Sequence, residues 1–208
     1  MKPKTALPAE PHKIRIGVSA CLLGHNVRYD GVHKLDRYIT EALGRIFGYV
    51  PVCPEVECGL PVPRETLHLV RDAASIRLVT TRTGIDHTGA MRRWCDAKLD
   101  GLAREELAGF IFKSRSPSCG LGEVPVYDAQ GMACGSGSGI FAAAFIHRNP
   151  AVPAIDEERL LDPALRRHFI DGVFFHARQA SLKAGGLTAD LAALHADLLL
   201  LILSHGPT

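Results

Sequence analysis

The sequence lacks a hydrophobic run long enough to cross a bilayer. Its most apolar stretch, Leu198–Leu203, is far shorter than the roughly 20 residues that a membrane helix needs. The opening segment, Met1–His12, is polar and contains three prolines, which is not the composition of a signal peptide. We therefore expect a flexible N-terminal lead over residues 1–13, a cytoplasmic location and no membrane contact.

The imbalance between positive and negative charge is also small. The chain has 24 Lys and Arg against 22 Asp and Glu, so its net charge of +2 neither requires a nucleic-acid partner nor excludes one. Of its 208 residues, 47% are hydrophobic. This composition is typical of a globular protein with one substantial domain and a small appendage.

The six cysteines include no Cys-x-x-Cys pair, and the ten histidines show no ligand spacing. Neither residue type therefore marks a zinc site by its pattern. A reducing cytoplasm disfavours disulfides. The cysteines must then be metal ligands, catalytic thiols or buried side chains.

Short β-rich runs alternate with helical patterns as far as residue 155. We expect helices at 34–46, 88–107 and 140–147, and strands at 14–18, 49–52, 76–81, 109–113 and 152–155. This alternation predicts an α/β fold, a parallel Rossmann-like sheet with flanking helices. The glycine-serine stretch at 135–139 lacks the lysine of a phosphate-binding loop, so we predict a tight turn there.

After Asp156 the chain becomes helical and leucine-rich, with Gly185-Gly186 as a break between two helices. We therefore expect a main domain at 14–155 and, over 156–208, a helical C-terminal extension or the start of a second domain. The last helix is apolar on most faces and needs a partner. A homodimer through the C-terminal helices, or contact with a further domain, would supply one.

Three cysteines share one position in the predicted sheet. Cys21 follows the first strand, Cys53 ends the second, and Cys119 lies in the loop after the strand at 109–113. The carboxyl ends of parallel strands meet at one edge, where open α/β folds bind ligands. Three thiols at one site suggest an iron-sulfur cluster with one open iron, but their spacing alone does not separate a cluster from zinc or a catalytic thiol.

These cysteines have charged neighbours suited to a site. Glu55 stands two residues after Cys53. Nearby cations lower the pKa of a thiol and favour the form that binds metals. The cations of these loops either contact the thiolates and substrate anions or pair with Asp30 and loop carbonyls. They are Arg28, Lys113 and Arg115.

Four ordered motifs carry a resemblance to a known family. They are Ser19–Gly24 (SACLLG), Arg28–Gly31 (RYDG), Pro51–Val56 (PVCPEV) and Lys113–Gly120 (KSRSPSCG). Together they resemble the thiouracil desulfidase family over roughly residues 14–155. The resemblance implies a [4Fe-4S] cluster held by Cys21, Cys53 and Cys119, whose fourth iron takes sulfur from the substrate without net redox chemistry.

The resemblance also implies that a glutamate and a serine assist. Glu55 would be the general base that activates water. Ser116 would donate a hydrogen bond to the pyrimidine or to the leaving sulfur, with Ser118 as its rival. Arg28 and Ser118 are the candidate substrate-binding residues. The predicted reaction converts 2-thiouracil, 4-thiouracil or 4-thiouridine to the oxo form and releases sulfide.

The C-terminal part resembles the junction of two-domain relatives. The matching segments are Glu157–Phe175 and Leu191–Pro207. In such relatives a second domain follows, and the substrate is 4-thiouridine in tRNA. The resemblance therefore implies tRNA as a partner beside a free thiolated base.

The other candidate ligands and bases have simpler interpretations. We expect Cys58 to be a neighbour of the site, Cys95 to be a small buried side chain on a helix, and Cys134 to lie outside the cluster. Glu57 and Glu65 compete weakly with Glu55 for the role of base.

Two other functions compete with the desulfidase. One is a regulatory or interaction module in which zinc or an iron-sulfur cluster is structural. The other is a cysteine hydrolase, which needs a Cys-His pair, and His25 is the sole histidine near any of the three key cysteines.

Overall fold

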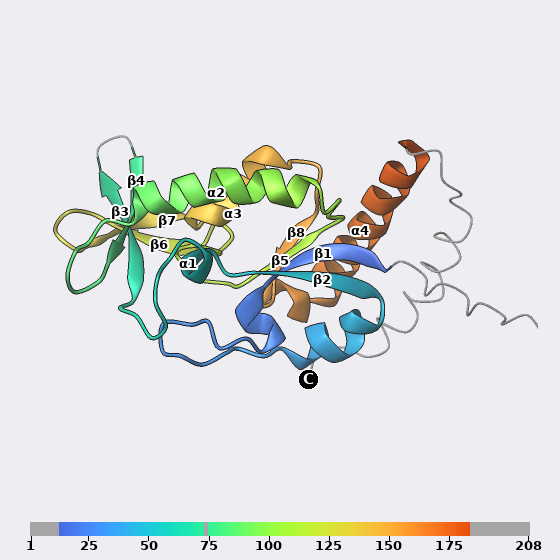
Figure 1. Ribbon diagram of the computed structural model, residues 1–208, viewed down its shortest axis with the longest axis horizontal. Helices are drawn as coiled ribbons and strands as arrows, with labels where there is room; N and C mark the ends of the chain where they lie inside the picture. The colour runs from blue at the N-terminus through green and yellow to red at the C-terminus, as the bar shows by residue number, and fades with distance from the viewer. Residues whose placement is uncertain (1–12, 73–74, 184–208) are drawn as a thin grey trace, which may run out of the picture.

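A parallel four-stranded sheet forms the centre of the molecule (Figure 1). The computed structural model describes residues 13–72 and 75–183. The sheet has the order β2-β1-β5-β8, and all its neighbours run parallel. Its strands are β1 (Ile14–Ser19), β2 (Phe47–Val52), β5 (Phe110–Phe112) and β8 (Ala154–Asp156). The predicted parallel sheet is confirmed, and its strands lie where the sequence places them.

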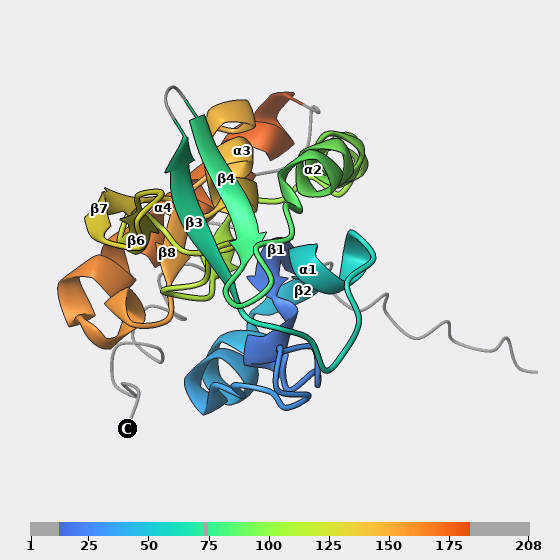
Figure 2. The same cartoon turned by 90° about the vertical axis from the view of Figure 1, so that its left-hand side faces the viewer.

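A second four-stranded sheet lies at one end of the molecule (Figures 1 and 2). Its order is β4-β3-β6-β7, and two of its three pairings are antiparallel. The strands are β3 (Leu67–Asp72), β4 (Ser75–Thr80), β6 (Val124–Tyr127) and β7 (Ala133–Gly137).

The sequence predicts only β4 of this second sheet. The other three strands, β3, β6 and β7, are short and contain few consecutive apolar residues, so they give a weak signal. The tight turn predicted at 135–139 is wrong over its first half, which belongs to β7. This strand is rich in glycine and serine and largely exposed, and it pairs with β6 through its backbone.

Helices cover both faces of the parallel sheet. Buried residues of α2 (Thr88–Ala103) and α3 (Ile140–Arg148) pack with Phe110 and Phe112 and also with the second sheet. The opposite face is covered by α4 (Pro163–Lys183). Helix α2 ends earlier than predicted, because Glu106 has a φ of 50°, which a helix does not allow.

The helix predicted at 34–46 is shorter than expected. The structure has a π-helical turn, η2 (Tyr38–Ala42), followed by a 3-10 turn, η3 (Leu43–Arg45). The Asp36 carboxylate accepts a hydrogen bond from the backbone N–H of Ile39 at 3.0 Å. This cap starts the helical segment only after Asp36. The other short elements are η1 (Ala20–Leu23), α1 (Pro54–Glu57) and η4 (Arg159–Leu161).

Helix α4 is the described part of the C-terminal extension. Its residues Phe169, Ile170, Val173 and Phe174 are buried in the same core as β1 and η2. None of the helices in residues 13–72 and 75–183 has the length and hydropathy of a membrane span. The predicted break at Gly185-Gly186 and the last helix lie outside the described residues, so the homodimer stays a prediction.

Gly139, the N-cap residue of α3, packs against the loop that carries Cys119. A Cβ atom at this position would lie 2.5 Å from the carbonyl carbon of Ser118 and 2.7 Å from the backbone nitrogen of Cys119. Both are backbone atoms, so neither can swing aside. We expect Gly139→Ala to lower the free energy of unfolding by about 1–3 kcal/mol, the usual cost of overpacking.

Urea denaturation measures this change, with Gly101→Ala as the matched control. Gly101 is inside α2, and the nearest atom to its added Cβ is Arg104 Nη2 at 4.0 Å. The control should be as stable as the original protein or up to about 1 kcal/mol more stable, since alanine favours helices. Equal stability of Gly139→Ala and the original protein would contradict the close contact.

Candidate active site

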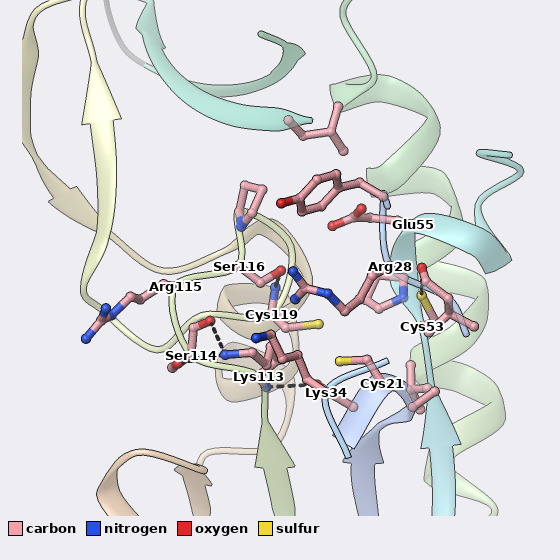
Figure 3. A pocket seen from close by; sticks show the side chains of 18 of the residues that line it. Cys21, Arg28, Lys34, Cys53, Glu55, Lys113, Ser114, Arg115, Ser116 and Cys119 are labelled. Carbon is pink, nitrogen blue, oxygen red and sulfur yellow. Dashed lines mark hydrogen bonds between the residues drawn. The ribbon is translucent and has the colours of Figure 1, made fainter. Parts of the chain in front are cut away.

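A cavity of about 420 Å³ opens at the carboxyl ends of β1, β2 and β5. Cys21, Cys53 and Cys119 all line it. In Figure 3 the three side chains lie around the same space, and the sulfurs of Cys21 and Cys119 face each other. The convergence predicted from the sheet topology is therefore confirmed.

Each cysteine is fixed by its own turn. The backbone carbonyl of Cys21, in η1, accepts a hydrogen bond from the N–H of Lys34 at 2.9 Å. The N–H of Cys53 donates to Glu57 Oε1 at 2.8 Å, which caps the start of α1. The N–H of Cys119 donates to Ser116 Oγ at 3.1 Å. These hydrogen bonds hold the backbone of each cysteine in place, so the three side chains extend from fixed positions.

Burial dominates the acidity of the three thiols. It raises the pKa of Cys21 to about 11, although Lys113 and Arg28 act in the opposite direction. Burial also raises the pKa of Cys53, and it raises that of Cys119 well above its usual value. The neighbouring cations do lower the pKa of Cys21, as expected, but desolvation outweighs their effect.

Three thiols on one cavity suit an iron-sulfur cluster. Thiolates are the usual protein ligands of such clusters, and the metal itself displaces the protons from buried thiols. Within the described residues, no group of three or more His, Cys, Asp or Glu side chains is close enough to hold a single metal ion. A cluster has a different requirement, since each cysteine then binds its own iron.

Glu55 points into the cavity from α1 and is held on both of its carboxylate oxygens (Figure 3). Arg64 Nε donates to Oε2 at 2.8 Å, and Arg64 Nη2 lies 2.6 Å from the same oxygen. Ser118 Oγ donates to Oε1 at 2.9 Å. Oε1 therefore keeps one lone pair for a further partner, whereas Oε2 is enclosed by the guanidinium group.

The two candidate serines occupy different places. Ser116 lines the cavity, and its Oγ accepts hydrogen bonds from the N–H groups of Ser118 and Cys119 at 3.2 and 3.1 Å. Among the described residues its own hydrogen has no recorded acceptor. Ser118 is fully buried behind the wall, and its hydroxyl is used by Glu55. The structure thus favours Ser116 as the serine that meets a substrate.

The cations of the cavity are largely paired, but mainly with Glu157 and Glu158 rather than with the expected Asp30 and loop carbonyls. Lys113 bonds to Glu157 and to the Ser114 carbonyl, and Arg115 pairs with Glu158 at 3.0 Å. Arg115 is mostly exposed and points away from the cysteines (Figure 3).

Arg28 is less completely satisfied. Its Nε lies 3.4 Å from Asp30 Oδ1 but is buried without a hydrogen bond of good geometry. Its guanidinium carbon lies 5.3 Å from the centre of the Tyr29 ring. Of the candidate residues, Arg28 is thus the cation with capacity left for a substrate.

The cavity wall also contains three residues that no sequence pattern assigns to the site, Ser19, Lys34 and Arg64. Arg64 follows a loop rich in proline and glycine, and nothing in that sequence indicates a partner. Ser19 belongs to a recognised motif, but only the structure shows that its hydroxyl accepts the N–H of Lys113 at 2.9 Å.

The remaining cysteines and glutamates agree with their simpler interpretations. Cys58 Sγ donates to the Glu55 carbonyl at 3.3 Å, Cys95 is buried on α2, and Cys134 is exposed on β7. None of them lines the cavity. Glu57 pairs with Lys98 at 2.7 Å, and Glu65 bonds to the backbone of 82–83.

Two comparisons with known proteins found a match for the chain. Residues 16–157 match the model of a protein family described as 2-thiouracil desulfurase. The chain is also similar to a solved structure described as the [4Fe-4S]-dependent thiouracil desulfidase TudS. The two are 32% identical with a TM-score of 0.57, and the match covers 75% of this chain and 97% of that one. No curated protein matches the chain.

The raised pKa values predict the order in which the thiols of the metal-free protein react. At pH 8 we expect iodoacetamide to modify exposed Cys134 first and Cys119 last, because a buried, protonated thiol is a poor nucleophile. The rate at Cys21 should rise with pH until about 11, where this thiol ionises. Peptide mass spectrometry measures each rate, and the urea-denatured chain is the control. Equal rates at Cys21 and Cys134 in the folded protein would contradict the account.

Proposed function

The chain belongs to the 2-thiouracil desulfurase family, and we propose that it removes sulfur from a thiolated uracil by means of a [4Fe-4S] cluster bound to Cys21, Cys53 and Cys119. One observation carries the proposal. Three cysteines from the ends of three neighbouring parallel strands line one cavity together with a partly buried, hydrogen-bonded glutamate. The family match over residues 16–157 supports assigning this chemistry to the domain at 14–155.

The donor set fits such a cluster and leaves one of its four irons without a protein ligand. When bound, the cluster supplies a Lewis-acidic iron that polarises the carbon-sulfur double bond of the substrate. The thiols need a reducing compartment to stay free, which supports a cytoplasmic location.

Glu55 is the proposed general base. Its Oε1 has the remaining lone pair, so this atom receives the proton of the attacking water. The hydrogen bond from Ser118 holds Oε1 in place, and Arg64 holds Oε2. The carboxylate can then accept a proton without first turning, which keeps the geometry of the reaction fixed.

Ser116 is the proposed hydrogen-bond donor to the substrate. Its oxygen already accepts two backbone N–H groups, which orients the hydroxyl hydrogen away from that loop. Donation to the pyrimidine or to the departing sulfur stabilises the charge that develops as the carbon-sulfur bond breaks. Ser118, the rival candidate, acts through Glu55.

Arg28 is the proposed substrate-binding residue. The Arg28 side chain lines the cavity and is 19% exposed, so its guanidinium group can donate to a carbonyl oxygen of the pyrimidine. The proposed substrates are 2-thiouracil, 4-thiouracil and 4-thiouridine, free or within tRNA. All of them present the same thiocarbonyl next to ring groups that donate and accept hydrogen bonds.

Anaerobic purification tests the cofactor and the reaction together. The protein should be brown, contain about four irons and four sulfides per chain, and release sulfide from at least one of the proposed substrates. Comparison of the free bases, the nucleoside and thiolated tRNA then ranks the substrates. A colourless protein with one bound zinc and no sulfide release would contradict the proposed function.

Substitution of the base and of the two serines tests their roles. Glu55→Gln keeps the shape of the side chain but cannot take up a proton, so kcat should fall about 10²–10⁴-fold, the usual contribution of a general base. Ser116→Ala should lower kcat more than Ser118→Ala, because the latter only loosens Glu55. Sulfide release, measured at equal cluster content, gives the rates.

Glu65→Gln is the matched control for the base, since Glu65 bonds to the backbone of 82–83 and does not line the cavity. Full turnover by Glu55→Gln with an intact cluster would remove Glu55 from the role of base. A larger effect of Ser118→Ala than of Ser116→Ala would reverse the assignment of the serines.

A further inference from the structure

The Arg64 side chain lies directly behind the proposed base and is almost completely buried, with 6% of it exposed. Its Nε and Nη2 both contact Glu55 Oε2, at 2.8 and 2.6 Å. Nη2 also donates to the Val27 carbonyl at 2.9 Å, and Nη1 donates to the Pro61 carbonyl at 3.2 Å. All three guanidinium nitrogens therefore have partners, and those partners lie in three separate segments of the chain.

We propose that Arg64 is a positioning residue for the reaction, one that fixes which oxygen of Glu55 faces the substrate. Because the guanidinium group encloses Oε2, Oε1 is left as the atom that can accept a proton. A carboxylate without this support could rotate and present either oxygen at varying distances. The inference rests on the proposed role of Glu55 as the base.

Arg64 also connects the base to the loop that carries Arg28. Its backbone N–H donates to the Tyr29 carbonyl at 2.8 Å, and its side chain bonds to the Val27 carbonyl. Arg64 therefore contacts the chain on both sides of Arg28. The base and the proposed substrate-binding residue are thus set relative to each other by one side chain.

The same carbonyl contacts a cluster ligand. Cys53 Sγ lies 3.8 Å from the Val27 carbonyl oxygen that Arg64 also binds. A thiolate bound to iron has no hydrogen to donate. In the cluster-loaded protein the Val27 carbonyl would therefore lose the hydrogen bond from Cys53 and keep the one from Arg64 Nη2. The planar fork of arginine places Nε and Nη2 on Oε2 while Nη1 reaches the Pro61 carbonyl, and the single nitrogen of lysine does not supply donors at these three positions.

The test is Arg64→Ala in the cluster-loaded protein. We expect kcat to fall about 100-fold, as displacement of a reacting group by about 1 Å does, while KM stays within about threefold because all three guanidinium nitrogens of Arg64 already bond to the protein. The visible absorbance of the cluster should be retained. Arg64→Lys should lose roughly tenfold, since it keeps the charge without the fork.

Chemical rescue separates positioning from general structural support. Methylguanidine added to Arg64→Ala should fill the vacated space and raise kcat by about tenfold, a gain of about 1.4 kcal/mol. It should not change the rates of Glu55→Gln or of the original protein. The control Arg77→Ala removes an arginine whose Nε donates to Asp86 at 2.9 Å outside the cavity, and it should keep full activity.

The outcomes distinguish this inference from the proposed function. If Glu55→Gln turns over fully, the proposed base is wrong whatever Arg64 does. If Glu55→Gln is slow but Arg64→Ala turns over at the original rate, only the positioning role is wrong. Loss of the cluster or of the fold in both Arg64→Ala and Arg64→Lys would also contradict it, since Arg64 would then be a structural residue.

Discussion

The site depends on the parallel alignment of β1, β2 and β5. Hydrogen bonding pairs Ser19 with Val52 across β1 and β2, and Val18 with Ile111 across β1 and β5. The chain therefore leaves all three strands at the same edge of the sheet. Cys21 and Cys53 reach the common cavity directly after β1 and β2, and Cys119 reaches it from the loop that follows β5. Phe110 and Phe112 stack with 4.1 Å between their ring centres and pack against α3. These contacts hold β5 in place next to the cavity.

The thiols and the carboxylate of this cavity lie in different electrostatic environments. The thiols are buried with a raised pKa, so they do not stand as free thiolates and depend on bound metal to lose their protons. Glu55, in contrast, has donors on both oxygens from Arg64 and Ser118. The protein thus provides a neutral ligand set and a supported carboxylate in one space. This division suits a reaction in which metal and base act on the same substrate.

The sequence predicts those parts of the molecule that follow from local patterns and topology. The cysteine positions are of this kind, because continuous apolar strands indicate a parallel sheet and each cysteine follows one of these strands in the sequence. The second sheet is not, since strands such as β7 pair through the backbone and carry no β-rich pattern. The contact of Arg64 with Glu55 joins residues nine apart across a proline-rich loop, and no periodicity encodes it. No local pattern predicts the role of Ser118 either, because only the packing of the fold brings its buried hydroxyl to Glu55.

Mössbauer spectroscopy of the ⁵⁷Fe-loaded protein tests the central claim most directly, because it reports on each iron of a cluster bound by three cysteines. With three irons bound to Cys21, Cys53 and Cys119, the fourth lacks a protein ligand. We expect a cluster in which one iron differs from the other three, and in which a thiolated uracil shifts the signal of that iron alone. Four equivalent irons that do not respond to the substrate, or an iron-free protein that still releases sulfide, would contradict it.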